Sequence, residues 1–153
     1  MQLNVFTDYA CRVLIYAAAH DRGPCTSDEI AEAFGISRHH LVKVINELQH
    51  LGFLETRRGR AGGIRLARAP ERIGLGEVIR RTEGTLALVE CFDRETDTCP
   101  LTPACGLRGA LKEAFEAFFA TLDRYTLADL VAQPRWIAQV TALFPPGGSG
   151  RAS

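Results

Sequence analysis

Three cysteines lie close together in one polar stretch of the chain: Cys91, Cys99 and Cys105. The stretch reads CFDRETDTCPLTPAC, and its acidic residues and prolines are not the composition of a hydrophobic core. A free cysteine is usually a small buried hydrophobe. Three of them in a polar loop therefore indicate sulfur chemistry, which means a disulfide, a metal site or a thiol redox sensor.

The spacing of the three cysteines separates these alternatives. Structural zinc sites typically use pairs such as CxxC and four ligands, whereas this loop has wide gaps and contains no histidine. Iron–sulfur clusters take thiolates as their natural ligands and tolerate varied spacing, and three cysteines would leave one iron for a weaker, exchangeable ligand. The spacing favours an iron–sulfur cluster over zinc. A thiol–disulfide switch needs only two cysteines and stays open.

The cellular compartment bears on the same choice. Residues 1–8 lack the basic start of a secretory signal, and the apolar run at residues 13–19 is too short to span a bilayer. We therefore expect a cytoplasmic protein with no membrane contact. Structural disulfides are rare in that compartment, which again favours metal or redox chemistry.

Composition predicts one small folded protein with an uneven charge distribution. The chain has 153 residues, of which 46% are hydrophobic and 24% charged, with a formal net charge of zero. Between residues 57 and 72 one glutamate faces six arginines, which are Arg57, Arg58, Arg60, Arg65, Arg68 and Arg72. Such segregation indicates a basic surface for a polyanion, separate from the acidic cysteine loop.

The elements that must position these groups begin with three helices. The first is predicted from Thr7, as its N-cap, to about residue 19. Thr26 and Glu29 have the spacing of a capping box, and Gly35 is placed to end that second helix. After a tight turn, Ser37 can cap a third helix over residues 38–50.

The second and third helices have the pattern of a helix-turn-helix. Its second helix enters the major groove of DNA and reads bases near its N-terminal end. The apolar face of residues 38–50 consists of Leu41, Val44, Ile45 and Leu48. The polar face carries the candidate DNA-binding residues Arg38, His39, His40 and Lys43.

A β-hairpin is predicted directly after the third helix. Two β-prone runs at residues 53–57 and 64–67 flank the glycines Gly59, Gly62 and Gly63, which permit a tight turn. A hairpin in this position is a wing. We expect its tip to carry Arg58, Arg60 and Arg65, which suit DNA phosphates or a narrow minor groove.

The second half is predicted as a short helix at residues 76–83, the cysteine loop and a long helix. Leu111, Phe115, Phe118 and Leu122 recur at helical spacing and make that long helix apolar over a wide face. A second copy of the chain would cover such a face, so we expect a homodimer. Thr126 can cap a final short helix.

The predicted fold is mainly α with a small β-hairpin, a winged helix-turn-helix domain followed by a long C-terminal dimerisation helix. We expect the DNA-binding domain at residues 1–80, the cluster-binding loop at 81–106 and the dimerisation and short terminal helices at 107–132. Residues 133–153, which end in PPGGSGRAS, are predicted to form a largely flexible tail.

Several segments together resemble one known family. They are FTDYACRVLIY, GISRHHLVKVINEL, RGRAGGIRL, the three-cysteine loop and YTLADLV. Over residues 1 to about 131 the chain resembles the Rrf-type winged-helix regulators, and among them the nitric-oxide-sensitive iron–sulfur repressors.

The resemblance implies a ligand set for the loop. It implies a homodimer with a [4Fe-4S] cluster, or alternatively a [2Fe-2S] cluster, held by Cys91, Cys99 and Cys105. It also implies Asp8 of the partner subunit as the fourth ligand. A cluster-biogenesis regulator of the same family carries a histidine where this chain has Arg108, which argues against that relative and its [2Fe-2S] ligand set.

The function that the resemblance implies is transcriptional repression. With its cluster intact the dimer would bind operator DNA of nitric-oxide-detoxification genes, and nitrosylation of the cluster by nitric oxide would release that DNA. The alternative is a winged-helix regulator that uses the loop cysteines as a metal-free thiol switch. We do not expect an enzyme, because the sequence has no P-loop, no GxGxxG motif after a strand and no Ser/His/Asp arrangement. Cys11 and Cys25 are interpreted as packing residues.

Overall fold

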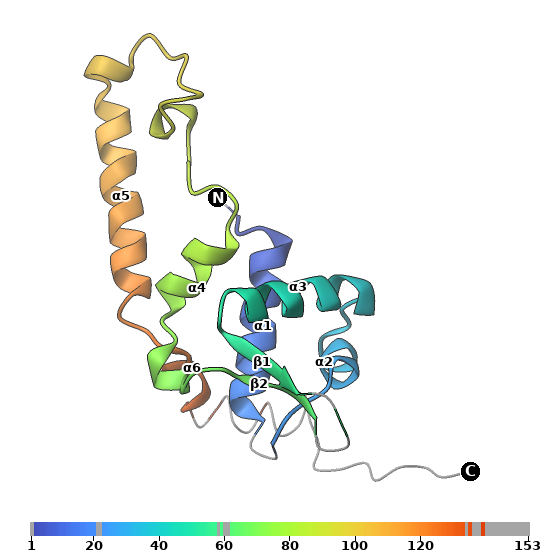
Figure 1. Cartoon of the computed structure of the whole chain (residues 1–153). Helices are drawn as coiled ribbons and strands as arrows, with labels where there is room; N and C mark the ends of the chain where they lie inside the picture. Colours follow the sequence, from blue (N-terminus) through green and yellow to red (C-terminus); the bar gives the residue numbers. More distant parts are fainter. Residues whose placement is uncertain are drawn as a thin grey trace.

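The computed structural model describes residues 2–20, 23–57, 59, 62–133, 135 and 139. Helices dominate it, with one antiparallel two-stranded hairpin (Figure 1). In chain order the helices and strands are α1 (Val5–Ala19), α2 (Ser27–Phe34), α3 (Arg38–His50), β1 (Leu54–Arg57), β2 (Gly63–Leu66), α4 (Leu75–Thr82), α5 (Gly106–Leu122) and α6 (Leu127–Val131). Single 3-10 turns lie at Pro70–Arg72, Glu90–Phe92 and Thr102–Ala104. The predicted fold class is confirmed.

Helix α1 begins earlier than the sequence predicts. Its N-cap is Asn4, whose side chain accepts a hydrogen bond of 2.7 Å from the backbone N–H of Thr7. The prediction of Thr7 as the cap is wrong, because a good capping residue three positions earlier already binds the free N–H there. Thr7 is instead fully buried inside the first turn, and its hydroxyl has no hydrogen-bond partner in the described part of the chain.

The helix-turn-helix follows its local signals closely. Thr26 and Glu29 form the predicted capping box at the start of α2, and Gly35 ends that helix with a φ of +62°. Ser37 caps α3 through the N–H of His40. The apolar face of α3 is buried as predicted, and it shares one core with Val13 and Leu14 of α1.

The hairpin is attached to the start of α2 as well as to α3. Its register pairs Leu54 with Leu66 and Arg57 with Gly63. Strand β1 begins one residue later than predicted and ends where predicted, and β2 lies one residue earlier than predicted. Beside it, Cys25 and Ile64 form an isolated antiparallel bridge with N–H···O distances of 2.9 and 2.7 Å. This bridge fixes the root of the wing against the helix-turn-helix.

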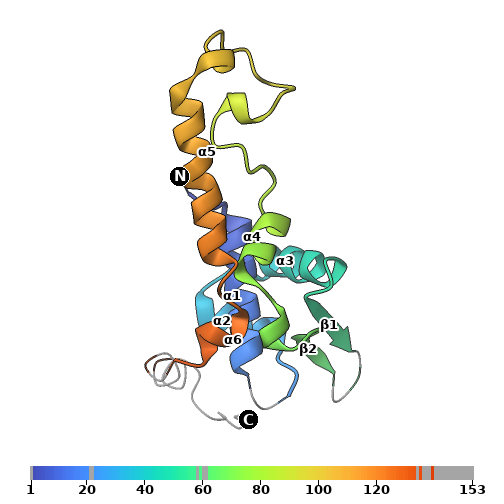
Figure 2. The ribbon, with the colours of Figure 1, turned by 90° about the vertical axis from the view of Figure 1, so that its left-hand side faces the viewer.

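Helix α5 stands away from the body formed by the other helices (Figures 1 and 2). Its base is held where Gly74 and Thr126 form an isolated bridge and the N–H of Leu127 binds the carbonyl of Ile73 at 2.8 Å. Thr126 caps α6 as predicted, here in a capping box with Asp129. The cysteine loop lies at the opposite, upper end of α5.

The described residues of this single chain cover little of α5. Phe119 is its one buried residue, while Leu107 at its start is 67% exposed. The predicted apolar face, including Leu111 and Phe115, is only half-buried. The homodimer stays a prediction, and nearly all of the predicted tail at residues 133–153 lies outside the described residues. Within the described ranges no helix is both long enough and apolar enough to cross a membrane.

Candidate functional site

The three loop cysteines lie where regular structure is short. Cys91 is in a single 3-10 turn, Cys99 lies in a stretch without regular secondary structure, and Cys105 is the N-cap of α5. All three are free thiols of intermediate exposure. The loop therefore places reduced sulfur near the protein surface at the upper end of α5.

Arg108 joins the two ends of this loop. Its side-chain Nε donates a hydrogen bond of 3.0 Å to the carbonyl of Cys91, and its backbone N–H donates one of 3.4 Å to Sγ of Cys105. Asp97 organises the middle of the loop, because its Oδ1 accepts from the N–H of Cys99 at 3.1 Å and from the hydroxyl of Thr102 at 3.0 Å. Sequence reasoning assigned neither residue this role.

The donor set of the loop fits an iron–sulfur cluster in its chemistry. Thiolates are the usual ligands of such clusters, and the loop supplies three that no disulfide occupies. As the described side chains lie, no three His, Cys, Asp or Glu residues converge to hold a metal ion. To hold a cluster, the loop would have to draw its sulfur atoms closer together.

Cys11 and Cys25 differ from the loop cysteines in their environment. Burial, and the nearby carboxylates of Asp8 and Glu83, raise the pKa of Cys11 to about 11. Burial likewise raises the pKa of Cys25 to about 11, and its thiol donates to the carbonyl of Ile64. A thiol that stays protonated at neutral pH is a poor nucleophile and metal ligand. This supports their interpretation as packing residues.

Asp8 is in the first turn of α1, and this helix belongs to the body below the cysteine loop (Figure 1). Its carboxylate forms a half-exposed ion pair with Arg12 of the next turn, at 2.7 Å. Its predicted role as a ligand for the partner subunit's cluster needs a second chain and stays a prediction.

The start of α1 is tied to the root of the loop by a contact that sequence reasoning missed. Both the backbone N–H and the side-chain amide of Asn4 donate to the carboxylate of Glu83, each at 2.9 Å. Glu83 ends α4, from which the chain runs to Cys91. Asp8 therefore lies one turn along a helix whose N-cap residue, Asn4, is bound to the segment that leads to the loop.

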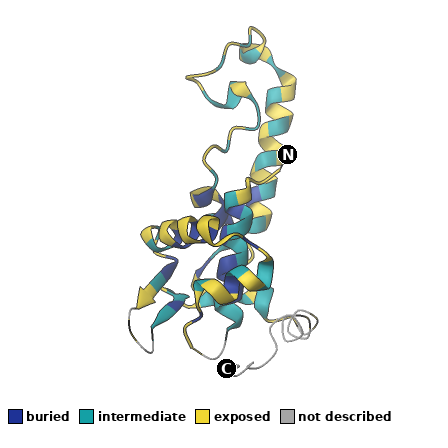
Figure 3. Ribbon diagram, turned by 90° about the vertical axis from the view of Figure 1, so that its right-hand side faces the viewer, coloured by how far each residue is buried: buried dark blue, intermediate teal, exposed yellow. Residues whose placement is uncertain are grey.

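The outward face of α3 is the candidate surface for the major groove. Arg38, His39, His40 and Lys43 are all exposed, and Figure 3 shows this face of α3 open to solvent. Arg38 also forms an ion pair of 3.0 Å with Asp28 of α2. Its guanidinium is thus already held beside the first turn of α3.

Among the described residues, Arg65 differs from its predicted place in the wing. Arg65 is not at the tip but within β2, where its guanidinium pairs with Glu55 of β1. Cross-strand neighbours face each other on one side of a hairpin, which is why Glu55 can reach Arg65. The predicted tip residues Arg58 and Arg60 lie outside the described residues.

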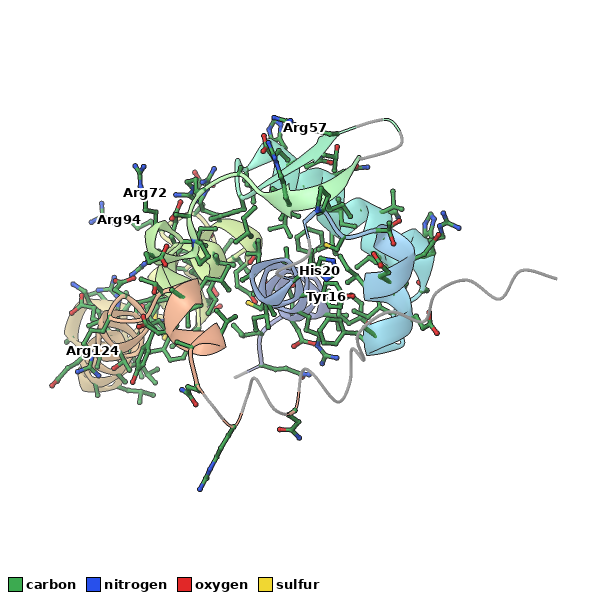
Figure 4. The ribbon with its side chains drawn as sticks, turned by 90° about the horizontal axis from the view of Figure 1, so that it is seen from below. Tyr16, His20, Arg57, Arg72, Arg94 and Arg124 are labelled. Carbon is green, nitrogen blue, oxygen red and sulfur yellow. The ribbon has the colours of Figure 1, made fainter. Side chains whose placement is uncertain are left out.

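Arg57 is the described arginine that lies near the tip of the wing, where the prediction placed Arg65. It ends β1 opposite Gly63, which has no side chain, and it is exposed without an ion-pair partner among the described residues. Its side chain projects from the hairpin (Figure 4). On the same strand, Thr56 accepts a hydrogen bond of 2.7 Å from Gln49 of α3, which fixes the wing beside the recognition helix.

Known proteins share this arrangement. The Rrf2 family, described as an iron-dependent transcriptional regulator, matches residues 3–133. The chain belongs to the Rrf2 family. The HTH-type transcriptional regulators NsrR of Geobacillus kaustophilus and Bacillus subtilis are 54% and 51% identical to it over 132 residues, which are 86% of this chain and 90% of each relative.

Solved structures agree with this assignment. CymR, the global cysteine regulator of B. subtilis, has a TM-score of 0.71 at 28% identity, over 86% of this chain and 97% of that one. IscR of T. potens has a TM-score of 0.70 at 26% identity, over 86% of each chain. The predicted resemblance is confirmed. This Rrf2 protein is a DNA-binding transcriptional regulator of the NsrR type and not an enzyme.

The two described arginines of the wing, Arg57 and Arg65, give a direct test of the surface that binds DNA. Arg57→Ala should weaken binding to all DNA sequences alike and lower the salt slope by about one, because it removes a free cation. Arg65→Ala should change the slope less, since the neighbouring Glu55 already balances that charge. Gel-shift titrations at several salt concentrations measure both. Equal slopes for the two variants would contradict this assignment.

Proposed function

We propose that the protein is a nitric-oxide-sensing repressor that holds an iron–sulfur cluster on Cys91, Cys99 and Cys105 and releases operator DNA when the cluster is attacked. The observation that carries this proposal is the set of three free thiols on a polar loop, at one end of α5, in a winged-helix regulator about half identical to NsrR proteins. We expect its operators to control nitric-oxide-detoxification genes, and we expect it to act in the cytoplasm.

The cluster proposed is [4Fe-4S], with [2Fe-2S] as the alternative. When bound, it would supply iron that nitric oxide attacks. The chain's own residues set the conditions around it. Arg108 holds the Cys91 and Cys105 ends of the loop together, and Asp97 fixes the turn before Thr102 that carries Cys99. Loss of the cluster that the three cysteines share would free this loop and the start of α5, which Cys105 caps.

Repression requires that DNA bind the cluster-loaded arrangement more tightly than the apo arrangement. A ligand that binds two states equally does not shift the equilibrium between them. We propose that two copies of the chain dimerise through the apolar face of α5. A twofold dimer can set two α3 helices about one DNA turn apart, which is the spacing that helix-turn-helix dimers need. A change in the loop that alters α5 then alters this spacing.

Anaerobic purification followed by visible absorption and iron and sulfide analysis tests the cluster. Gel shifts with and without a nitric-oxide donor test the release of DNA. We expect a coloured protein with iron and sulfide in equal amounts, and DNA release on exposure to nitric oxide. A colourless protein with stoichiometric zinc would overturn the proposal. Iron-free protein whose DNA binding follows thiol oxidation would support the metal-free thiol switch instead.

Asp8 gives a separate prediction, since we propose that it is the partner subunit's ligand to the fourth iron. Asp8→Ala should keep a cluster on three cysteines but change its spectrum and its rate of reaction with nitric oxide, because a carboxylate is a harder and more labile ligand than a thiolate. Stopped-flow absorption measures both.

Arg12→Ala is the matched control for this prediction. It removes the ion pair with Asp8 but leaves the carboxylate in place, so its spectrum should match that of the wild type. If Asp8→Ala also matches the wild type in spectrum and rate, Asp8 serves only the first turn of α1 and the fourth ligand is another group.

A further inference from the structure

One ion pair joins the base of α5 to the DNA-binding body. Arg80 of α4 and Asp123, the C-cap of α5, meet through two parallel hydrogen bonds of 2.6 and 2.7 Å. The Arg80 guanidinium also lies 4.2 Å from the ring centroid of Phe119, the one buried residue of α5. A planar guanidinium bound at both nitrogens has its direction fixed as well as its distance.

Gly76 of α4 makes room for this pair. A Cβ atom on Gly76 would lie 1.9 Å from Oδ1 of Asp123 and 2.8 Å from a terminal nitrogen of Arg80. No side chain larger than hydrogen fits there while the pair is in place. Gly76 has an ordinary helical conformation, so this close approach, and not a special φ, is what requires glycine at this position.

Close packing does not by itself fix α5 against the body. A cavity of about 210 Å³ lies beside the contact, lined by Ile79 and Glu83 of α4, by Phe115 and Phe118 of α5 and by Leu3. Helix α4, by contrast, is firmly part of the body, because Val78 and Ile79 are buried. The polar contact at Arg80 therefore restrains a helix whose apolar contact with the body is incomplete.

The other end of the same helix carries the proposed sensor. Cys105 caps α5 at its start, and seventeen residues of helix separate it from Asp123 (Figure 2). The loop itself packs on α5 through the ring contact of Phe92 with Phe115. A small rotation of α5 about its base would move the end that carries the loop much further than it moves the base. The contact at the base of α5 is therefore one place where a change in the loop can reach the DNA-binding body, beside the contact of Asn4 with Glu83 at the root of the loop.

We propose that the Arg80–Asp123 pair, seated on Gly76, is the positioning contact that couples the state of the cysteine loop to the affinity for DNA. This inference rests on the proposed function, and it assigns the transmission to named side chains at the base of α5. None of the three residues lies in the cysteine loop, in α3 or in the hairpin, so we expect each to act through the direction of α5.

Two variants disturb the contact by different physics. Arg80→Gln removes the paired guanidinium, and Gly76→Ala keeps every charge but displaces the Asp123 carboxylate. Arg81→Gln is the matched control: Arg81 is the next residue of α4, is 41% exposed against 39% for Arg80, and pairs with Glu77 of its own helix rather than with α5. All three should keep the colour of the wild-type protein, since the loop is unchanged.

The measurement is the ratio of DNA affinities of cluster-loaded and apo protein, taken from gel-shift titrations of each variant. Coupling between two sites typically changes an affinity by about 5–150-fold, and we expect a ratio in this range for the wild type. In Arg80→Gln and Gly76→Ala the ratio should be closer to one. Arg81→Gln should keep the wild-type ratio. A coloured Arg80→Gln with reduced coupling separates positioning from a loss of the site.

The outcomes distinguish this inference from the proposed function. A wild-type ratio of one would overturn the proposed function and this inference with it. A high wild-type ratio that Arg80→Gln or Gly76→Ala retains would overturn the inference alone. An equal fall in Arg81→Gln would also overturn it, because the effect would then follow from the loss of any α4 cation.

Discussion

Cys99→Ser should yield a colourless protein with little iron or sulfide that still folds. Serine is a poor substitute for thiolate toward iron, and the polar loop contributes little to the core, which lies among α1 to α4, the hairpin and α6. Cys91→Ser and Cys105→Ser should do the same. Their DNA affinity should equal that of the wild-type apo protein, and it should no longer respond to nitric oxide. Absorption, iron analysis and gel shifts measure these effects.

Cys105→Ser is the most informative of the three. Sγ of Cys105 accepts the N–H of Arg108 at the start of α5, and a serine hydroxyl caps a helix at least as well. This variant therefore removes a proposed ligand without weakening the cap at the start of α5. If it keeps the cluster, Cys105 is a cap and not a ligand.

Cys11→Ser and Cys25→Ser are the controls for the loop variants. Both thiols are held protonated by burial, which raises the pKa of each to about 11, so neither should bind iron. Both variants should keep the colour, and Cys25→Ser can still donate to the carbonyl of Ile64. Loss of colour in these two, with retention in the loop variants, would reverse the ligand assignment.

Gly63→Ala should disable the wing while leaving the cysteine loop intact. Gly63 has a φ of +150°, and a Cβ there would lie 2.8 Å from both the carbonyl of Cys25 and the Cβ of Pro24. The strained backbone alone costs roughly 1–3 kcal/mol of stability, and relief requires β2 to leave its bridge with Cys25. DNA affinity should fall because the wing arginines shift from their place beside α3.

Gly74→Ala is the control for this substitution. A Cβ at Gly74 meets no atom within 4 Å, and its φ of −78° suits any residue. Urea denaturation and gel shifts should show a large loss for Gly63→Ala and little change for Gly74→Ala, with the cluster colour kept in both. A Gly63→Ala variant as stable as the wild type would contradict the geometry of the wing root.

The elements that the sequence predicted well are those specified by neighbouring residues. The capping box of Thr26 and Glu29, the Gly35 turn and the Ser37 cap each act within four residues, so the helix-turn-helix could be predicted from the sequence. The same holds for Thr126 and α6. Composition alone set the loop cysteines apart from Cys11 and Cys25, because polar neighbours predict exposure.

The contacts that only the tertiary structure decided join residues far apart in the chain. Asn4 meets Glu83 and Arg80 meets Asp123 across 79 and 43 positions, and no local pattern marks them as partners. Two shorter-range pairings were also missed, Arg65 with Glu55 across the hairpin and Arg38 with Asp28 across the helix turn. A charge in a sequence has many partners within reach of an unfolded chain, and packing of the core selects one by fixing the distances between helices and strands.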